Sequence, residues 1–261
     1  MLIDTHCHLV DDYVNPADMP DVMARAQDAG VGTIIVPCAD PTDPPKVLEL
    51  CDRHDNLFAT IGIHPEFAGQ QSPNYENLLP HPRVVGIGEI GLDYHYGLGH
   101  RDAQIELFRR QLEIASRAGL PVAIHTRDAE QDTAEILCDP AYSGIGGSGI
   151  PGVMHCYSSS WDLAKKMLDR GFYFSASGII TFKNADELRD IFRRIPIDRI
   201  VIETDAPFLA PVPHRGKKAE PFMVADTARA LAELRGIPFA ELENILLENT
   251  KKLYPKLNSK I

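Results

Sequence analysis

Side chains that can bind a metal ion or transfer a proton follow several short apolar segments of this sequence. Imidazoles and carboxylates are the usual ligands of Zn, Mn, Co and Ni, and they also act as general acids and bases. Four histidines and two carboxylates exceed the needs of one tetrahedral ion, so the pattern predicts two divalent ions bridged by a carboxylate. The set is His6, His8, Glu89, His125, His155 and Asp205.

The spacing of these residues indicates that their side chains meet at one site. His6 and His8 are two apart, so on an extended chain they share a face about 6.6 Å apart, while Cys7 points away. Glu89 comes where an apolar run stops among glycines, and a buried carboxylate there is costly without a counter-charge. We therefore expect Glu89 to face the two histidines across a shared site.

Eight apolar, β-branched segments separate longer helical patterns, and these segments must position the ligands. They are 2–5, 33–36, 57–63, 84–87, 122–124, 152–154, 172–174 and 200–202. Continuous apolar runs are typical of parallel strands that helices cover on both faces. Residues 101–118 have apolar side chains at helical spacing, and four helical patterns end in a glycine before an apolar residue, at Gly30, Gly119, Gly171 and Gly236.

This alternation over 261 residues predicts one α/β domain, residues 1–261, folded as a (β/α)8 TIM barrel. In such barrels the carboxyl ends of the strands carry the active site, which is where the ligand set falls. An open doubly wound sheet is the alternative if the first and eighth segments do not pair.

The composition limits the kind of partner. A net charge of -11, from 26 basic and 37 acidic residues, opposes the coating of a long duplex by the protein. Five widely spaced cysteines without a CxxC pair fit reduced thiols, and the start of the chain has no signal-peptide pattern. We therefore expect a cytoplasmic protein without a membrane span and without an obligate protein partner.

Six blocks of the sequence, in order along the chain, resemble the TatD family of metal-dependent deoxyribonucleases within the amidohydrolase-like barrels. They are residues 4–9 (DTHCHL), 62–65 (GIHP), 88–94 (GEIGLDY), 125–127 (HTR), 155–157 (HCY) and 203–209 (ETDAPFL). The resemblance implies a first metal ion held by His6, His8, Glu89 and Asp205, and a second held by Glu89, His125 and His155. The ions could be Zn, Mn, Mg, Co or Ni.

The expected reaction is in-line attack on phosphorus by a water molecule activated between two metal ions. We expect Asp205 to act as general base, with Glu89 as the bridging carboxylate and Glu203 supporting the site from the same strand. The expected substrate contacts are His64, Tyr94, Arg127, Tyr157, Arg215 and Lys217. The basic residues suit phosphate, His64 suits a substrate contact or a ligand-orienting role, and the aromatic residues suit stacking on a base or sugar.

Two positions depart from the family pattern. Ser159 stands where the family usually has glycine, and Ala219 stands for asparagine in the block after the eighth strand, which bears on how that loop positions a substrate. The predicted activity is trimming of DNA ends or short single strands, as a 3'-5' exonuclease. The alternatives are a two-metal amide or ester hydrolase acting on a small molecule or aminoacyl ester, and a barrel that keeps a metal for structural reasons.

Overall fold

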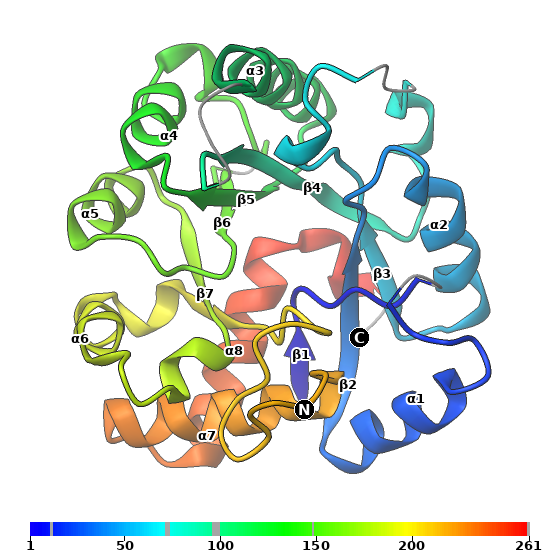
Figure 1. Ribbon diagram of the computed structural model, residues 1–261, viewed down its shortest axis with the longest axis vertical. Helices are drawn as coiled ribbons and strands as arrows, with labels where there is room; N and C mark the ends of the chain where they lie inside the picture. The colour runs from blue at the N-terminus through cyan, green and yellow to red at the C-terminus, as the bar shows by residue number, and fades with distance from the viewer. Residues whose placement is uncertain (11–12, 71–73, 96–99, 148, 260–261) are drawn as a thin grey trace.

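The computed structural model describes residues 1–10, 13–70, 74–95, 100–147 and 149–259. Eight strands form one sheet in chain order, each parallel to the next. The strands are β1 (Leu2–Asp4), β2 (Val31–Pro37), β3 (Leu57–Thr60), β4 (Val84–Asp93), β5 (Val122–Arg127), β6 (Gly152–Met154), β7 (Tyr173–Ala176) and β8 (Ile200–Ile202). Figure 1 shows that the sheet curls around an axis while helices surround it.

The helices mostly alternate with the strands, as the sequence predicts, but the described residues between β3 and β4 form only two 3-10 turns, and two α-helices follow β8. They are α1 (Met19–Asp28), α2 (Asp43–Arg53), α3 (Arg101–Ala118), α4 (Glu130–Leu137), α5 (Trp161–Asp169), α6 (Asp186–Arg194), α7 (Val224–Arg235) and α8 (Phe239–Leu253). The expected helix over residues 101–118 is confirmed at both ends. It stops at Gly119, whose φ of 64° is the left-handed conformation that glycine adopts without strain.

The first and last strands meet and nearly close the barrel. The Thr5 backbone N–H donates to the carbonyl of Ile202 at 3.1 Å, and an isolated parallel bridge joins Cys7 to Ala206. The (β/α)8 barrel is therefore confirmed, and the open doubly wound sheet is wrong because the sheet has paired its two outer strands. The same bonds set the segments that follow β1 and β8 side by side.

Two apolar layers stabilise this arrangement, because alternate side chains of a strand point to opposite faces. Ile34 and Val36 of β2 belong to the layer between strands and helices, whereas Ile35 points into the barrel. Leu253 and Tyr254, at the end of α8, pack into the same inner cluster as Ile35. Side chains fill the barrel interior around Ile35 and Tyr254, so a ligand site must lie closer to the carboxyl ends of the strands.

The fourth and fifth strands differ from the expectation. Strand β4 continues past Ile87 to Asp93, and β5 continues past Ile124 to Arg127, so Glu89 and His125 lie within strands instead of after them. The pairing of the two strands shifts register between Ile87 and Ile90, and both strands continue to pair beyond the apolar run. Glycine at position 91 allows this, since a Cβ there would lie 1.9 Å from the His125 carbonyl oxygen.

Across the described part of the chain, no helix is both long enough and apolar enough to cross a membrane.

Candidate active site

Five strands deliver the predicted metal ligands to one end of the barrel. Glu89 and His125 project from neighbouring β4 and β5, and His155 directly follows β6. The segments after β1 and β8 are tied by their backbones: the Asp205 N–H donates to the His6 carbonyl and the His8 N–H donates to the Ala206 carbonyl, both at 2.9 Å. The six ligands are thus brought together from positions up to 199 residues apart, because parallel strands end at the same edge.

Glu89 lies between the histidines of β5 and β6. Its Oε1 is 2.8 Å from His125 Nδ1 and 3.2 Å from His155 Nε2. A ligand atom from each of these three residues lies within 4.8 Å of the others, which is a geometry that can hold a metal ion. We call Glu89, His125 and His155 the second-ion group.

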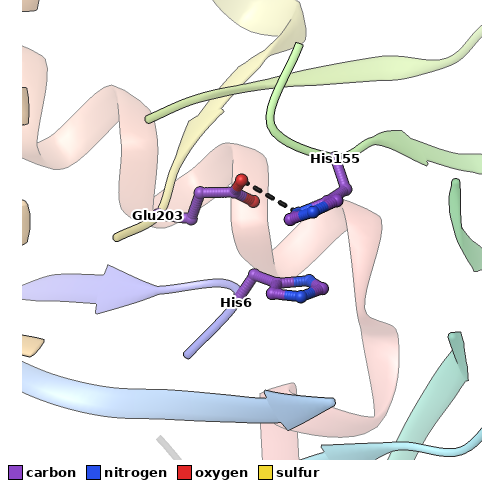
Figure 2. A group of neighbouring side chains, drawn as sticks. All are labelled: His6, His155 and Glu203. Carbon is purple, nitrogen blue, oxygen red and sulfur yellow. Dashed lines mark ion pairs between the residues drawn. The ribbon is translucent and has the colours of Figure 1, made fainter. Parts of the chain in front are cut away.

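Each histidine of the second-ion group has a further carboxylate behind it. His125 Nε2 lies 3.0 Å from Asp93 Oδ2. His155 Nδ1 lies 2.9 Å from Glu203 Oε1, as the dashed line in Figure 2 marks. Carboxylates in this position orient a metal-binding imidazole and increase its basicity. Glu203 also accepts the Cys156 backbone N–H at 2.7 Å, so it contacts the backbone of the segment after β6 as well as the ring of His155.

His6, His8 and Asp205 form a second cluster, the first-ion group, with one ligand atom of each within 4.8 Å of the others. Asp205 Oδ1 lies 3.9 Å from His6 Nε2 and 3.8 Å from His8 Nε2. His6 Nε2 is 3.4 Å from Glu89 Oε2, so Glu89 faces both groups. Figure 2 shows the His6 ring lying beside that of His155, and the two centroids are 3.7 Å apart.

The electrostatics of the cluster favour a bound cation. Burial raises the pKa of Asp205 to about 8 and lowers that of His8 to about 3. Burial also opposes ionisation of Glu89, but His155, His125 and His6 outweigh it and hold the pKa of Glu89 well below its usual range. The buried His6 Nε2 and His8 Nδ1 have no hydrogen-bond partner within the described residues. Imidazole nitrogens without partners, set among carboxylates, suit the mixed N/O coordination of a divalent metal.

The cluster, apart from His6, lines a cleft of about 580 Å³ at the carboxyl ends of the strands. His64 and Arg127, two of the expected substrate contacts, also line it. His64 Nδ1 accepts the Glu66 backbone N–H at 3.2 Å, which leaves Nε2 3.9 Å from Glu89 Oε1. Burial lowers the pKa of His64 to about 4, so the ring is neutral at pH 7.

Four other expected substrate contacts are absent from the described residues that line the cleft: Tyr94, Tyr157, Arg215 and Lys217. The Tyr157 ring is 1% exposed, which prevents stacking on a ligand in this conformation. The Tyr94 hydroxyl donates to Asp132 Oδ2 at 2.7 Å, and the Arg215 guanidinium lies over the Phe182 ring at 3.7 Å. The Lys217 side chain is exposed outside the cleft. The structure therefore gives no support to substrate contacts by these four residues.

The sequence reasoning gave no role to three residues that the structure places at the site. Asp93 approaches His125, and Tyr13 and Phe208 line the cleft. Asp93 could have been found, since in an extended strand it lies on the same face as Glu89 four residues earlier. Tyr13 and Phe208 lie in loops, where no periodicity indicates the direction of a side chain.

Several known proteins are similar to this chain in sequence or in structure. A family profile described as "TatD related DNase" matches residues 3–255. YabD of Bacillus subtilis, an uncharacterized metal-dependent hydrolase, is 38% identical over 258 residues, covering 97% of this chain and 99% of YabD. YcfH of Escherichia coli, with the same description, is 38% identical over 259 residues and covers 97% and 95%. The crystal structure of YJJV, a TatD homolog from Escherichia coli, has a TM-score of 0.87 at 31% identity, covering 97% of this chain and 98% of that one.

The barrel, the histidine and carboxylate cluster and these relatives define a metal-dependent hydrolase. The chain belongs to the TatD family.

Proposed function

We propose that this hydrolase is a phosphodiesterase that removes nucleotides from the 3' ends of single-stranded DNA. The observation that carries the proposal is the convergence of six side chains of metal-ligand type, five of which line one cleft. The description of the matching family, which names a DNase, supports the choice of substrate.

Two groups of side chains would hold the metal ions. His6, His8, Asp205 and one oxygen of Glu89 would bind the first, and His125, His155 and the other oxygen of Glu89 the second. Divalent ions of Zn, Mn, Mg, Co or Ni, when bound, supply Lewis acidity that lowers the pKa of water and neutralises charge on a phosphate. We therefore propose that the active enzyme binds two divalent ions, one in each group.

The protein's own residues would position and deprotonate the nucleophile. Asp205 borders the cleft with one carboxylate oxygen near both His6 and His8, so it can accept the proton of the attacking water. Glu203 is 1% exposed and would act through His155, which it orients, without touching substrate. Arg127 lines the cleft on the β5 side, where its guanidinium suits a phosphate oxygen.

The charge of the molecule limits the length of nucleic acid that it would grip. A net charge of -11 disfavours a long duplex, which would need many phosphate contacts, so ends and short single strands are the proposed substrates. The five cysteines are free thiols, which supports action in the reducing cytoplasm, and the proposal needs no protein partner.

The test uses metal-depleted protein that is reloaded separately with Mg, Mn, Zn or Co. We expect release of 5'-mononucleotides from single-stranded oligonucleotides with a free 3' end, and little release from 3'-blocked ones. Parallel assays use p-nitrophenyl esters, amides and aminoacyl esters. Turnover of these substrates without turnover of any phosphodiester would overturn the proposal in favour of an amide or ester hydrolase.

A further inference from the structure

Phe208 is a large apolar side chain exposed beside the metal-ligand cluster. Its ring is 51% exposed and lines the cleft. The backbone ties it to the site, because the Phe208 N–H donates to the carbonyl of Asp205 at 2.9 Å. An exposed aromatic ring loses the free energy that burial would provide, so packing of the barrel does not account for its position.

Tyr13 stands next to Phe208 on the same side of the cleft. The two ring centroids are 6.2 Å apart and their planes meet at 78°, so the rings form a corner. The His8 ring lies 4.9 Å from that of Tyr13 and 6.3 Å from that of Phe208. We call Tyr13 and Phe208 the aromatic corner. A flat ring entering it can stack on one wall and present its edge to the other.

The opposite wall of the cleft is polar. Thr126, Arg127 and Ser158 line both the cleft and an adjoining hollow of about 360 Å³, and the acidic Asp128 and Glu130 line only the hollow, so Arg127 is the cation on the cleft side. The metal-ligand cluster lies in the cleft that these two walls share. A ligand that spans the site would therefore have a flat apolar part at one end and an anionic or polar part at the other.

We propose that the aromatic corner is a subsite for the nucleobase attached to the scissile phosphate. A nucleotide has the chemistry that these walls recognise, since its base is planar and its phosphates are anionic. Stacking accepts any base, so the subsite gives a preference for bases over abasic ends without strong sequence selectivity. The inference rests on the proposed function and adds the group that the enzyme recognises beside the bond it cleaves.

The test compares two ligands that bind but carry no cleavable diester. One is the 5'-monophosphate of 2-aminopurine deoxyribonucleoside, whose fluorescence falls when the base stacks, and the other is deoxyribose 5-phosphate. With Mg-loaded protein we expect the nucleotide to bind about 5- to 20-fold more tightly than the sugar phosphate, and its fluorescence to be quenched.

Four variants locate the effect. Phe208→Ala and Phe208→Leu should remove most of the preference and the quenching, whereas Phe208→Trp should keep both because it retains a flat ring. Val212→Ala is the matched control, since Val212 is 48% exposed nearby and is not among the residues that line the cleft. We expect it to match the wild type.

The nucleobase subsite and the phosphodiesterase activity are overturned by different results. If the wild type prefers the nucleotide and Phe208→Ala keeps the same preference and quenching, the aromatic corner is not the base subsite, although the phosphodiesterase proposal stands. If the wild type binds neither ligand and releases no mononucleotide from any oligonucleotide, both proposals are overturned.

Discussion

The two halves of the metal-ligand cluster are held in different ways. In the second-ion group, each histidine has a carboxylate behind its ring, Asp93 for His125 and Glu203 for His155. In the first-ion group, Asp205 Oδ1 lies farther from the rings, at 3.9 Å from His6 Nε2 and 3.8 Å from His8 Nε2. Orientation by a second carboxylate strengthens metal binding by an imidazole. The halves should therefore differ in affinity although their ligand types are similar.

The first-ion group is organised by hydrogen bonds of the Asp4 carboxylate instead. Asp4 Oδ1 accepts the Thr204 backbone N–H at 2.9 Å, and its Oδ2 accepts the Thr204 hydroxyl at 2.6 Å. These bonds join the end of β1 to the segment after β8, and so place His6 beside Asp205. In the second-ion group, nearby carboxylates fix the orientation of the histidine rings. In the first-ion group, hydrogen bonds hold the segments after β1 and β8 close together.

Glu89 faces both halves, so changing it should have the largest effect. Glu89→Gln keeps the shape but removes the charge that would bridge the two ions. We expect loss of both ions and a fall in turnover of more than about 100-fold, the upper limit typical for residues that only orient ligands. Metal analysis by mass spectrometry and steady-state kinetics measure this. Retention of two ions per chain would contradict the bridging role.

The carboxylates behind the histidines should have the next largest effect. Asp93→Asn and Glu203→Gln are expected to weaken the second ion about 10- to 100-fold and to leave the first nearly unchanged. Isothermal titration calorimetry with the metal ion measures the affinities of the first and second ions separately. Asp128→Asn is the control, because Asp128 is exposed and pairs with His95, outside the cluster. Equal weakening of both ions would remove the distinction between the halves.

Graded removal of metal from the wild type tests the comparison without a mutation. As chelator is added, we expect the first-ion group to lose its metal at a free-metal concentration about 10-fold higher than the second, because Asp205 is 3.8 and 3.9 Å from its histidines, farther than Asp93 and Glu203 are from theirs. Cobalt-substituted protein reports each loss through its visible absorption. Simultaneous loss, or the reverse order, would argue against the role given to Asp93 and Glu203.

The hydrogen bonds between Thr204 and Asp4 should affect the stability of the fold more than the metal affinity of the first-ion group. Thr204→Val removes a hydroxyl that donates to buried Asp4 and accepts the Ala206 N–H. We expect the free energy of unfolding of the metal-free protein to fall by ~1 to 3 kcal/mol, because a buried carboxylate loses a donor. Urea denaturation measures it. Thr204→Ser keeps the hydroxyl and should restore most of the loss.

The ion pair between Arg101 and Asp132 lies outside both groups, and its removal should have the smallest effect, a change in the free energy of unfolding. Arg101 donates to Asp132 at 2.7 and 2.8 Å, and holds the pKa of that carboxyl below its usual value. A lowered pKa stabilises the fold above the ordinary value near 4, and the contribution is lost as the pH falls through the folded value. Urea denaturation of metal-free Asp132→Asn should show a deficit at pH 7 that narrows at pH 3. A deficit independent of pH would contradict this linkage.

The order of the elements and the types of ligand followed from local features of the sequence. Apolar runs, helical spacing and terminal glycines depend on neighbouring residues, so α3 could be predicted to the residue. The six metal-ligand residues could be chosen because imidazoles and carboxylates followed these runs. The ends of β4 and β5 were not predicted, since their extension depends on a register shift between two strands.

Local patterns in the sequence were enough to predict a barrel and the residue types at the carboxyl ends of its strands. The pairing of side chains across the site depends on the three-dimensional fold: Asp93 lies behind His125, Tyr157 lies inside the protein, and Phe208 lies at the cleft. The difference comes from the distance along the chain over which each interaction acts. Periodicity and turn preferences act over a few residues, whereas these placements depend on closure of the barrel between strands that lie far apart in the chain.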